Sequence, residues 1–562
     1  MTFRINVRFV FLSLIIICCN NNCKQKTVVK EKEIVTTPEQ MNDQVAANIK
    51  SVLAFAKDNN GKINDSIRLA QYDLVNNFYE QNNYRSIWST RESWLPLADS
   101  MFGFIKNSKY FGLYPSDYHL DELEGLRKKI ADDSLARMDA ISWTNADLMY
   151  SDAFMKTLKD LKEGRLLPDS ISITTKKKMI DSFFTKNLDE AGKAGALTTS
   201  FQSLEPSDMG YQSLRTALKE FVDKMDSKIY LYINYPFKDS LAFVRKIHKR
   251  LLQSGFGNPS IALPDSVEFR KELKKYQSAH ELKVDGIAGQ GVVNSLNSND
   301  NQRFKRIAIT LDRYKLLPKL PQSYIWVNIP GFYLKVWNND SLVLESKVIV
   351  GKPETHTPVL TSAISDMVTY PKWTIPESII KKDILPALKK DPGYLDRKGF
   401  SLVDANGETV NPYTVTWSKY TKGIPWKVIQ GSGDDNALGV FKFNFNNPYS
   451  VYLHDTNQRY LFKNADRALS HGCVRVEKWQ ALAFFIARED SIAMNEGQTI
   501  SYNADSIMTW VANKSRKRIM VKKKLPLYIE YFTCEAKNDK IVFYKDIYND
   551  DKYLALKYFA NK

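Results

Sequence analysis

Hydrophobic residues along this chain follow two different spacings. From about residue 41 to residue 255 they recur at helical intervals, as in the segment where Met149, Ala153 or Phe154, and Leu158 fall on one stripe. Gly164 follows this segment and provides a stop for the helix, as expected after a helical run. The pattern predicts a helical scaffold domain over residues 41–255, whose task the spacing does not reveal.

A second, smaller helical unit is predicted over residues 256–300. Phe269, Leu273 and Tyr276 stand at positions i, i+4 and i+7, which gives a helix one hydrophobic face. Asp285-Gly286 predicts a turn, and a further helix is expected to begin near Val292. The unit resembles the small three-helix peptidoglycan-binding domain in Tyr276-Gln277, residues 284–289 and Leu296-Asn297. A helical spacer without a ligand is the alternative interpretation.

Beyond residue 323 the spacing changes to strand-like alternation. Strands are predicted at Tyr324–Asn328, Phe332–Trp337 and Leu342–Val350, within a β-rich domain over residues 323–515. Residues 301–322 are expected to form a linker helix. Residues 516–562 are expected to form C-terminal strands that pack on the β-rich domain or on the helical scaffold. The stretch 374–427 interrupts the alternation and is interpreted as a lid-like insertion or a long surface connection.

The N-terminal residues have the features of a secretory signal. Arg4 and Arg8 precede an uninterrupted apolar run over residues 9–17, which is too short to cross a bilayer core of about twenty residues. Cys18 and Cys19 follow the run as in a bacterial lipobox, so either is a candidate for lipidation, and simple cleavage is the alternative. We expect a signal peptide over residues 1–19, a tether over residues 20–40, and a membrane-anchored lipoprotein in the periplasm or cell envelope of a Gram-negative-type bacterium.

Composition limits the class of protein. The 562 residues predict roughly three or four domains, and 43% hydrophobic content is typical of a globular protein. A net charge of +17 favours an anionic partner such as a membrane surface or an acidic cell-wall polymer, although a generally basic surface is an equal alternative. No zinc knuckle, RNA-binding signature or basic helix supports nucleic acid as a partner.

Cys473 is the strongest candidate for chemistry. Only Cys473 and Cys534 lie beyond the N-terminal segment, and a disulfide between them is the simplest alternative to a reactive thiol. Cys473 lies beside Gly472 and within two residues of His471 and Arg475, and nearby positive charge favours the thiolate. Eighteen residues separate it from His454, a distance that a strand, a turn and a returning strand would close to give a nucleophile and its base.

A zinc site is the main competing interpretation. His454, His471 and Cys473 would supply three ligands, whereas a structural site needs four and a catalytic site needs three and a water. The chain has no Cys-x-x-Cys or His-x-x-x-His spacing to support it. We therefore expect no metal and no other cofactor.

The Ser470–Arg475 segment and the upstream His454 resemble the signature of the L,D-transpeptidases with a YkuD-type catalytic domain, in particular the large, multidomain YcbB-like branch. Further matching elements are Gly351-Lys352, Thr357-Pro358, Pro371-x-Trp373-x-x-Pro376, Asn436–Gly439 with Lys442-Phe443, Leu453–Thr456, Gly164–Leu166 and Pro526–Thr533. The resemblance covers nearly the whole mature chain. It implies a multidomain α+β fold with a helical scaffold, a peptidoglycan-binding domain and a β-rich YkuD-type catalytic domain.

The resemblance also implies the reaction of a cysteine acyltransferase. Cys473 would attack the third residue of a tetrapeptide stem, release D-Ala, and pass the acyl group from a thioester to an amine of a second stem, giving a 3–3 cross-link. His454 is expected to be general base and acid, and His471 to shape the loop, although these roles are interchangeable at this stage. The Gly472 and Cys473 N–H groups are candidates for an oxyanion hole.

Four further residues are candidates for substrate binding. Arg475 would hold a substrate carboxylate or form a structural salt bridge. Ser470 is expected to hydrogen-bond within its loop, and Tyr452 and Asn436 are pocket or packing residues. The expected partners are peptidoglycan stem peptides and glycan strands. An L,D-carboxypeptidase and a non-catalytic wall-binding lipoprotein are the alternative functions, and acylation by carbapenems would separate the enzyme from the binding protein.

Overall fold

The computed structural model describes residues 31–167, 179–197, 201–226, 228–280, 282–494 and 501–560. Cys18 and Cys19, with the expected signal peptide, lie outside these residues. The chain divides into two compact units, one formed by residues 1–101, 121–155 and 184–196, and the other by residues 102–120, 156–183 and 197–562. The chain is a multidomain α+β protein, as the sequence predicts.

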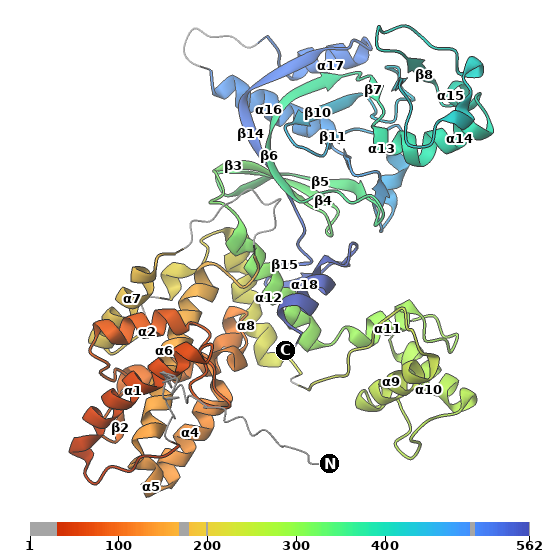
Figure 1. The fold of residues 1–562 in the computed structure, drawn as a ribbon. Helices are drawn as coiled ribbons and strands as arrows, with labels where there is room; N and C mark the ends of the chain where they lie inside the picture. Colours follow the sequence, from red (N-terminus) through yellow and green to blue (C-terminus); the bar gives the residue numbers. More distant parts are fainter. Residues whose placement is uncertain are drawn as a thin grey trace, which may run out of the picture. The chain divides into compact units, whose positions relative to one another are not determined.

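The first unit is helical. Its buried residues include Met149, Ala153 and Phe154, and Leu158 of the same helix is buried as well, so the predicted stripe in the sequence is the buried face of one long helix. Val35 is also buried, and its N–H donates to the Met138 carbonyl, so residues expected to belong to the tether are part of this fold. The helices, red to yellow in Figure 1, are α1 (Met41–Asp58), α2 (Tyr72–Gln81), α3 (Pro96–Lys106), α4 (Leu120–Asp132), α5 (Ser134–Arg137), α6 (Ala140–Lys162) and α7 (Asp181–Ala194), of which α3, α4, α6 and α7 continue into or out of the second unit.

The second unit begins with a helical part held by a buried ionic cluster. Its helices are α8 (Met209–Lys224) and α12 (Asp300–Leu316), the latter at the expected position of the linker helix. Asp312 accepts from Arg165 Nε at 2.8 Å and from Lys315 Nζ at 3.0 Å, and Arg165 also donates to the Gly112 carbonyl. Because a buried charge is stable only when it is paired, these contacts fix α12 against the Gly112 and Arg165 segments.

Three helices form the next part of the second unit. They are α9 (Ser240–Gln253), α10 (Ser266–Ala279) and α11 (Gln290–Asn297), and they share one hydrophobic cluster that includes Ile247, Leu273, Tyr276 and Leu296. The structure therefore begins this unit before residue 256, because α9 buries its hydrophobic face against α10. Gly286 has a φ of 70°, consistent with the predicted turn at Asp285-Gly286.

The β-rich domain is a nine-stranded mixed sheet. Its order is β12-β5-β13-β11-β10-β6-β14-β3-β4, and a further pairing joins the end strand β4 to β5, the strand next to β12. The strands are β3 (Ser323–Asn328), β4 (Tyr333–Asn338), β5 (Ser341–Gly351), β6 (Leu360–Thr369), β10 (Phe441–Phe445), β11 (Leu453–His454), β12 (Ala468–Ser470), β13 (Val474–Val476) and β14 (Arg518–Glu530). Figure 1 shows the blue strand β14 beside the green strands β3 and β6, so the chain after residue 516 completes the centre of the sheet.

The stretch expected to be a lid or a surface connection is a folded insertion, here called the lid. It has its own sheet, in the order β7-β9-β8, and its own hydrophobic cluster, which includes Ile384, Leu388 and Trp417. Its elements are β7 (Trp373–Thr374), α13 (Glu377–Ile379), a π-helical turn (Ile380–Ile384), α14 (Leu385–Lys390), α15 (Tyr394–Arg397), β8 (Phe400–Val403) and β9 (Lys427–Gln430). The insertion is therefore a small subdomain, cyan in Figure 1.

The remaining elements are α16 (Trp479–Ile492), α17 (Ala504–Ala512), the hairpin of β15 (Cys534–Lys537) and β16 (Lys540–Phe543), and α18 (Asp550–Tyr558). The sequence predicts only strands after residue 516, and α18 is an addition to that expectation. None of the helices in the described part of the chain combines the length and apolarity needed to cross a bilayer.

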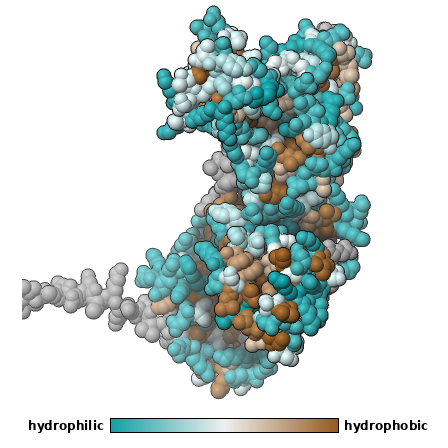
Figure 2. Space-filling view, turned by 90° about the vertical axis from the view of Figure 1, so that its right-hand side faces the viewer, coloured by the Kyte–Doolittle hydropathy of each residue, from teal (hydrophilic) through white to brown (hydrophobic). Residues whose placement is uncertain are grey.

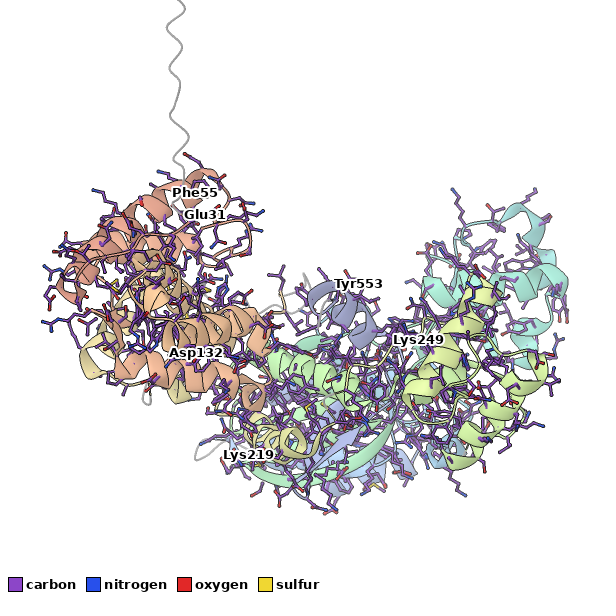
Figure 3. The ribbon with its side chains drawn as sticks, turned by 90° about the horizontal axis from the view of Figure 1, so that it is seen from below. Glu31, Phe55, Asp132, Lys219, Lys249 and Tyr553 are labelled. Atoms are coloured by element: carbon purple, nitrogen blue, oxygen red, sulfur yellow. The ribbon has the colours of Figure 1, made fainter. Side chains whose placement is uncertain are left out.

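The visible surface in Figure 2 is mostly hydrophilic, with patches of hydrophobic residues between. Exposed lysines contribute to the positive charge of the chain, among them Lys219 on α8 and Lys249 on α9, which Figure 3 labels. These two lysines belong to different helices.

Candidate active site

Two short parallel strands bring Cys473 and His454 to one face of the sheet. Leu453 of β11 pairs with Val474 of β13, and His454 pairs with Arg475. Leu453 and Val474 are buried in the core of the sheet. Because side chains alternate along a strand, Cys473, His454 and Arg475 lie on the opposite face. The strand, turn and returning strand predicted from the sequence therefore place the two residues close together.

The thiol of Cys473 is neutral in the resting site. Cys473 is a free cysteine with a partly exposed side chain. Burial of the sulfur raises the pKa of the thiol, while Tyr452, Lys442 and Arg475 lower it by smaller amounts. The net direction is upward, so the positive charges near the thiol do not produce a standing thiolate. Attack by this sulfur requires a base to remove its proton.

His454 is neutral as well. It is 4% exposed, and burial, followed by the positive charge of Arg475, lowers its pKa to about 3. Hydrogen bonds with the backbone of Asp455 and Leu438 raise the pKa, and Lys442 lowers it by less than Asp455 raises it. Among the described residues Nδ1 is buried without a hydrogen-bond partner. An uncharged imidazole with an uncommitted nitrogen is suited to accept a proton from a neighbouring thiol.

His471 has a different environment, although it is only two residues from the cysteine. Its side chain is exposed, and its Nε2 lies 2.8 Å from Oδ2 of Asp383, in the π-helical turn of the lid. π-helical turns often occur at functional sites. His471 thus joins the loop before Cys473 to the lid.

The loop that carries Cys473 has a constrained backbone. Gly472 has a φ of 117°, and a Cβ at this position would lie 3.2 Å from the His356 carbonyl. Ser470 Oγ donates to the Cys473 carbonyl at 2.6 Å and accepts from the Gly472 N–H at 3.1 Å, so Ser470 bonds within its own loop. The Gly472 N–H, expected in an oxyanion hole, is thereby occupied. The Cys473 N–H has no acceptor within the described residues.

A second segment fixes this loop from the outside. Thr357 Oγ1 donates to the Gly472 carbonyl at 2.8 Å and accepts from the Gly351 N–H at 2.8 Å. Tyr548 Oη donates to the Gly351 carbonyl at 2.7 Å and accepts from the Thr357 N–H at 3.1 Å. The His356 ring stacks on Tyr548 with centroids 3.9 Å apart. The C-terminal part of the chain therefore supports the loop that carries the cysteine.

The residues expected to bind substrate have different surroundings in the structure. Arg475 donates from Nη1 to Gln458 at 3.1 Å and makes no salt bridge with an acidic side chain in the described part of the chain. The Tyr452 ring lies 5.6 Å from that of His454. Asn436 is buried and bonds to the backbone of Gly431, Pro371 and Leu438, so it braces a loop and does not face a substrate.

The sequence interpretation missed Lys442 as a site residue. Lys442 of β10 pairs with His454 of β11, and its Nζ lies 3.8 Å from the centroid of the Tyr452 ring. In the sequence, Lys442 was distinguished only by its place in the segment Asn436–Phe443. A lysine in a strand cannot be recognised as a site residue before the pairing of that strand with its neighbours is known. Asp383 and Thr357 were missed for the same reason, since their contacts with the loop are tertiary.

The competing interpretations of the cysteines receive no support from the geometry. No group of three His, Cys, Asp or Glu side chains converges on a common point within the residues that the structure describes. Cys534 is free and buried, and its thiol lies 3.2 Å from Thr310 Oγ1. Cys473 and Cys534 therefore do not form a disulfide.

Comparison with known proteins assigns two regions of the chain. Residues 322–490 match the family model of the L,D-transpeptidase catalytic domain, YkuD, and residues 73–218 match a scaffold domain model. A Haemophilus influenzae protein with the name "Putative L,D-transpeptidase" is 34% identical over 259 residues, which are 46% of this chain and 50% of that protein. The chain therefore spans about half the length of the curated relative it matches.

Solved structures of L,D-transpeptidases are also similar to parts of the chain. A mutant of the Enterococcus faecium enzyme is 13% identical, with 38% of this chain and 51% of that chain covered and a TM-score of 0.16. An enzyme from Stackebrandtia nassauensis is 11% identical, with 54% and 97% covered and a TM-score of 0.15. These scores are too low to add to the assignment, which rests on the family model and the curated relative. Residues 322–490 form an L,D-transpeptidase catalytic domain of the YkuD family.

Proposed function

We propose that this protein is a cysteine acyltransferase that forms 3–3 cross-links in peptidoglycan. The observation that carries the proposal is the parallel pairing of β11 with β13, which sets His454 beside Cys473 on one face of the sheet. The partners implied by this function are peptidoglycan stem peptides and glycan strands, and the positive charge of the chain suits an acidic polymer.

The first half of the reaction is an acylation. The thiol proton of Cys473 passes to His454 as Sγ attacks the carbonyl carbon of the third residue of a tetrapeptide stem. The tetrahedral intermediate collapses when the bond to the nitrogen of the terminal D-Ala breaks, and His454 returns the proton to that nitrogen. Free D-Ala leaves and a thioester remains on Cys473. The Cys473 N–H, which has no acceptor within the described residues, is the donor that we assign to the developing oxyanion.

The second half transfers the acyl group. A side-chain amine of a second stem attacks the thioester carbonyl and gives a proton to His454 as the C–N bond forms. The C–S bond breaks, and His454 returns the proton to the sulfur. If water replaced the amine, the product would be a tripeptide and the enzyme an L,D-carboxypeptidase.

The test is incubation of the purified protein with disaccharide-tetrapeptides, followed by mass spectrometry of the products. We expect 3–3 dimers and free D-Ala with the wild type and neither with Cys473→Ala. Cys534→Ala is the matched control, because Cys534 is buried in another part of the fold and should be dispensable for the reaction. Dimers that persist in Cys473→Ala would overturn the proposal, and monomeric tripeptide as sole product would redirect it to carboxypeptidase activity.

A carbapenem provides an independent test of the nucleophile. We expect a covalent adduct on the wild type and on Cys534→Ala, and none on Cys473→Ala. A protein that binds isolated cell wall but forms neither adduct nor product would be a non-catalytic wall-binding protein.

We also propose that the chain is anchored to a membrane of the cell envelope by lipid on Cys18 or Cys19. The apolar run before these cysteines supports the proposal. Intact-mass measurement of protein extracted from membranes should show a lipid-modified N-terminal cysteine. A mass equal to that of an unmodified, cleaved chain would exclude the anchor.

A further inference from the structure

Two cations flank His454 in a row across three adjacent strands. Lys442 of β10 pairs with His454 of β11, which in turn pairs with Arg475 of β13. Directly opposite residues of neighbouring strands project from the same face of a sheet, with Cβ atoms about 5 Å apart. Cys473 lies on this face too, one pleat from Arg475. The base therefore stands between two positively charged side chains, and both of these charges also act on the thiol of Cys473.

Lys442 has no acidic partner in the described residues. Its ammonium group lies over the Tyr452 ring, 3.8 Å from the centroid. The acid that exerts a Coulombic effect on Lys442 is Asp366, on the adjacent strand β6. That carboxylate is already bonded to Arg518, at 3.1 and 3.2 Å, and to Asn444, at 2.8 Å. The charge of Lys442 is thus left uncompensated at the edge of the site.

Arg475 is also uncompensated. One of its terminal nitrogens donates to the neutral side chain of Gln458, and its Nε is buried without a hydrogen-bond partner in the described part of the chain. Burial lowers the pKa of the guanidinium group. A planar guanidinium with an unused edge is suited to a carboxylate, which it binds through two parallel hydrogen bonds.

This arrangement is costly for the protein alone. Partly buried cations without a counter-ion are unfavourable, and two of them beside a catalytic base reduce its affinity for the proton that it must accept. An anionic ligand between them would remove both disadvantages. It would neutralise the cations and restore the basicity of His454 at the moment when the substrate is bound.

We propose that Lys442 and Arg475 together bind a carboxylate of the donor stem next to the scissile amide, and that Lys442 is a specificity-determining residue. The inference rests on the proposed function. Two carboxylates of a tetrapeptide donor have this chemistry. One is the terminal carboxylate of the leaving D-Ala, and the other is a side-chain carboxylate on the diamino acid at the third position.

The experiment compares three donors, which are the unmodified tetrapeptide, the tetrapeptide amidated at D-Ala, and the tetrapeptide amidated at the third residue. Release of the terminal residue is measured with the wild type, Lys442→Met and Lys442→Arg. Methionine keeps the length of the side chain without its charge, and arginine keeps the charge. Lys463→Met, at an exposed position of the same domain, is the matched control.

We expect Lys442→Met to lower kcat/KM for the unmodified donor about ten- to hundredfold, the size expected for a lost charged hydrogen bond. For the donor amidated at the recognised carboxyl, wild type and Lys442→Met should be equally slow, which identifies that carboxyl. Lys442→Arg should retain most of the activity, and this shows that the site has folded.

Two outcomes would overturn the inference. In the first, Lys442→Met lowers kcat/KM by the same factor for all three donors, which would mean that the lysine acts only on the thiol and on His454. In the second, Lys442→Met has the same kcat/KM as the wild type for every donor. A wild type that releases no terminal residue from any donor contradicts the proposed function instead, so the two failures are distinguishable.

Discussion

His454 is on the strand that pairs with the strand after Cys473, and His471 is on the loop before Cys473, yet the environments of the two histidines differ. His454 is 4% exposed and has cations on both neighbouring strands. His471 is exposed and paired with the carboxylate of Asp383. The cations beside His454 favour its neutral imidazole, whereas the ring of His471 is held by a hydrogen-bond contact with the lid. The two histidines, which are interchangeable in the sequence motif, are therefore not interchangeable in the structure.

This difference assigns the proposed roles. A general base must be uncharged and must have a free nitrogen, and His454 has both properties. The Nε2 of His471 is committed to the lid, so this residue is placed to position the loop and to connect it with the lid. The predictions below test this distinction, beginning with the largest expected effect.

The first prediction compares the two histidines directly. His454→Gln should lower the rate of D-Ala release about 10²–10⁴-fold, the range that general acid–base catalysis contributes. His471→Gln should lower it less than about tenfold, because only the contact with Asp383 is lost. Rates are measured with the tetrapeptide donor under saturating conditions. The opposite order of effects would exchange the roles of the two histidines.

The second prediction concerns the pH dependence of kcat/KM, which reports the free enzyme. With the pKa of His454 lowered to about 3, the base stays neutral and the wild type should retain activity far below pH 6. Arg475→Gln removes the largest charge effect on His454, so the pKa rises and the acidic loss of activity should begin at higher pH. Lys442→Gln should act in the same direction to a smaller extent.

The result to compare is the position of the acidic limb, which is the pH at which kcat/KM falls on the acidic side of the profile. The maximum value of kcat/KM is not used, since both substitutions are also expected to weaken substrate binding. Lys463→Gln, at an exposed position outside the row of cations, should leave the limb where it is. An acidic limb near pH 6.5 in the wild type would mean that His454 is not the base or that its surroundings change before the chemical step.

The sequence predicted the parts of the molecule in which local pattern and tertiary structure agree. The strands from Tyr324 to Val350 were correctly predicted because turn residues separate apolar runs. Cys473 and His454 were found because the chemistry of a Cys–His pair and the spacing of a returning strand point to the same two residues. The structure then supplied the parallel pairing that the spacing could only suggest.

Other features depend on contacts that no local pattern records. Lys442 became a site residue only when β10 was placed in register with β11. Asn436 was a candidate for the pocket, but its amide is used by the backbone of its own loop. The lid was ambiguous because its hydrophobic cluster is assembled from short segments, none of which has a clear period. Tertiary packing thus determined which of the polar residues near the motif face the thiol.

The third prediction concerns the loop that carries Cys473. It tests whether support from Thr357 is needed to keep the thiol facing β11 and His471 facing the lid. Thr357→Val removes the hydroxyl that bonds to the Gly472 carbonyl and the Gly351 N–H. We expect kcat/KM to fall about ten- to thirtyfold at every pH, since two buried hydrogen bonds are lost and each contributes about 1 kcal/mol. The control Thr216→Val, on the exposed face of α8, should have wild-type activity. Unchanged kcat/KM in Thr357→Val would show that the loop does not depend on this support.

The smallest effect is expected for the contact between the lid and His471. Asp383→Asn keeps a hydrogen-bonding side chain but removes its negative charge, and a half-exposed polar contact of this kind contributes only about 1 kcal/mol or less. We therefore expect a two- to fivefold increase in KM with little change in kcat. Glu377→Gln, in α13 of the lid and bonded to Lys381, is the control. A loss in kcat comparable to that of His454→Gln would show that His471 acts with Asp383 in proton transfer, and the distinction between the two histidines would fail.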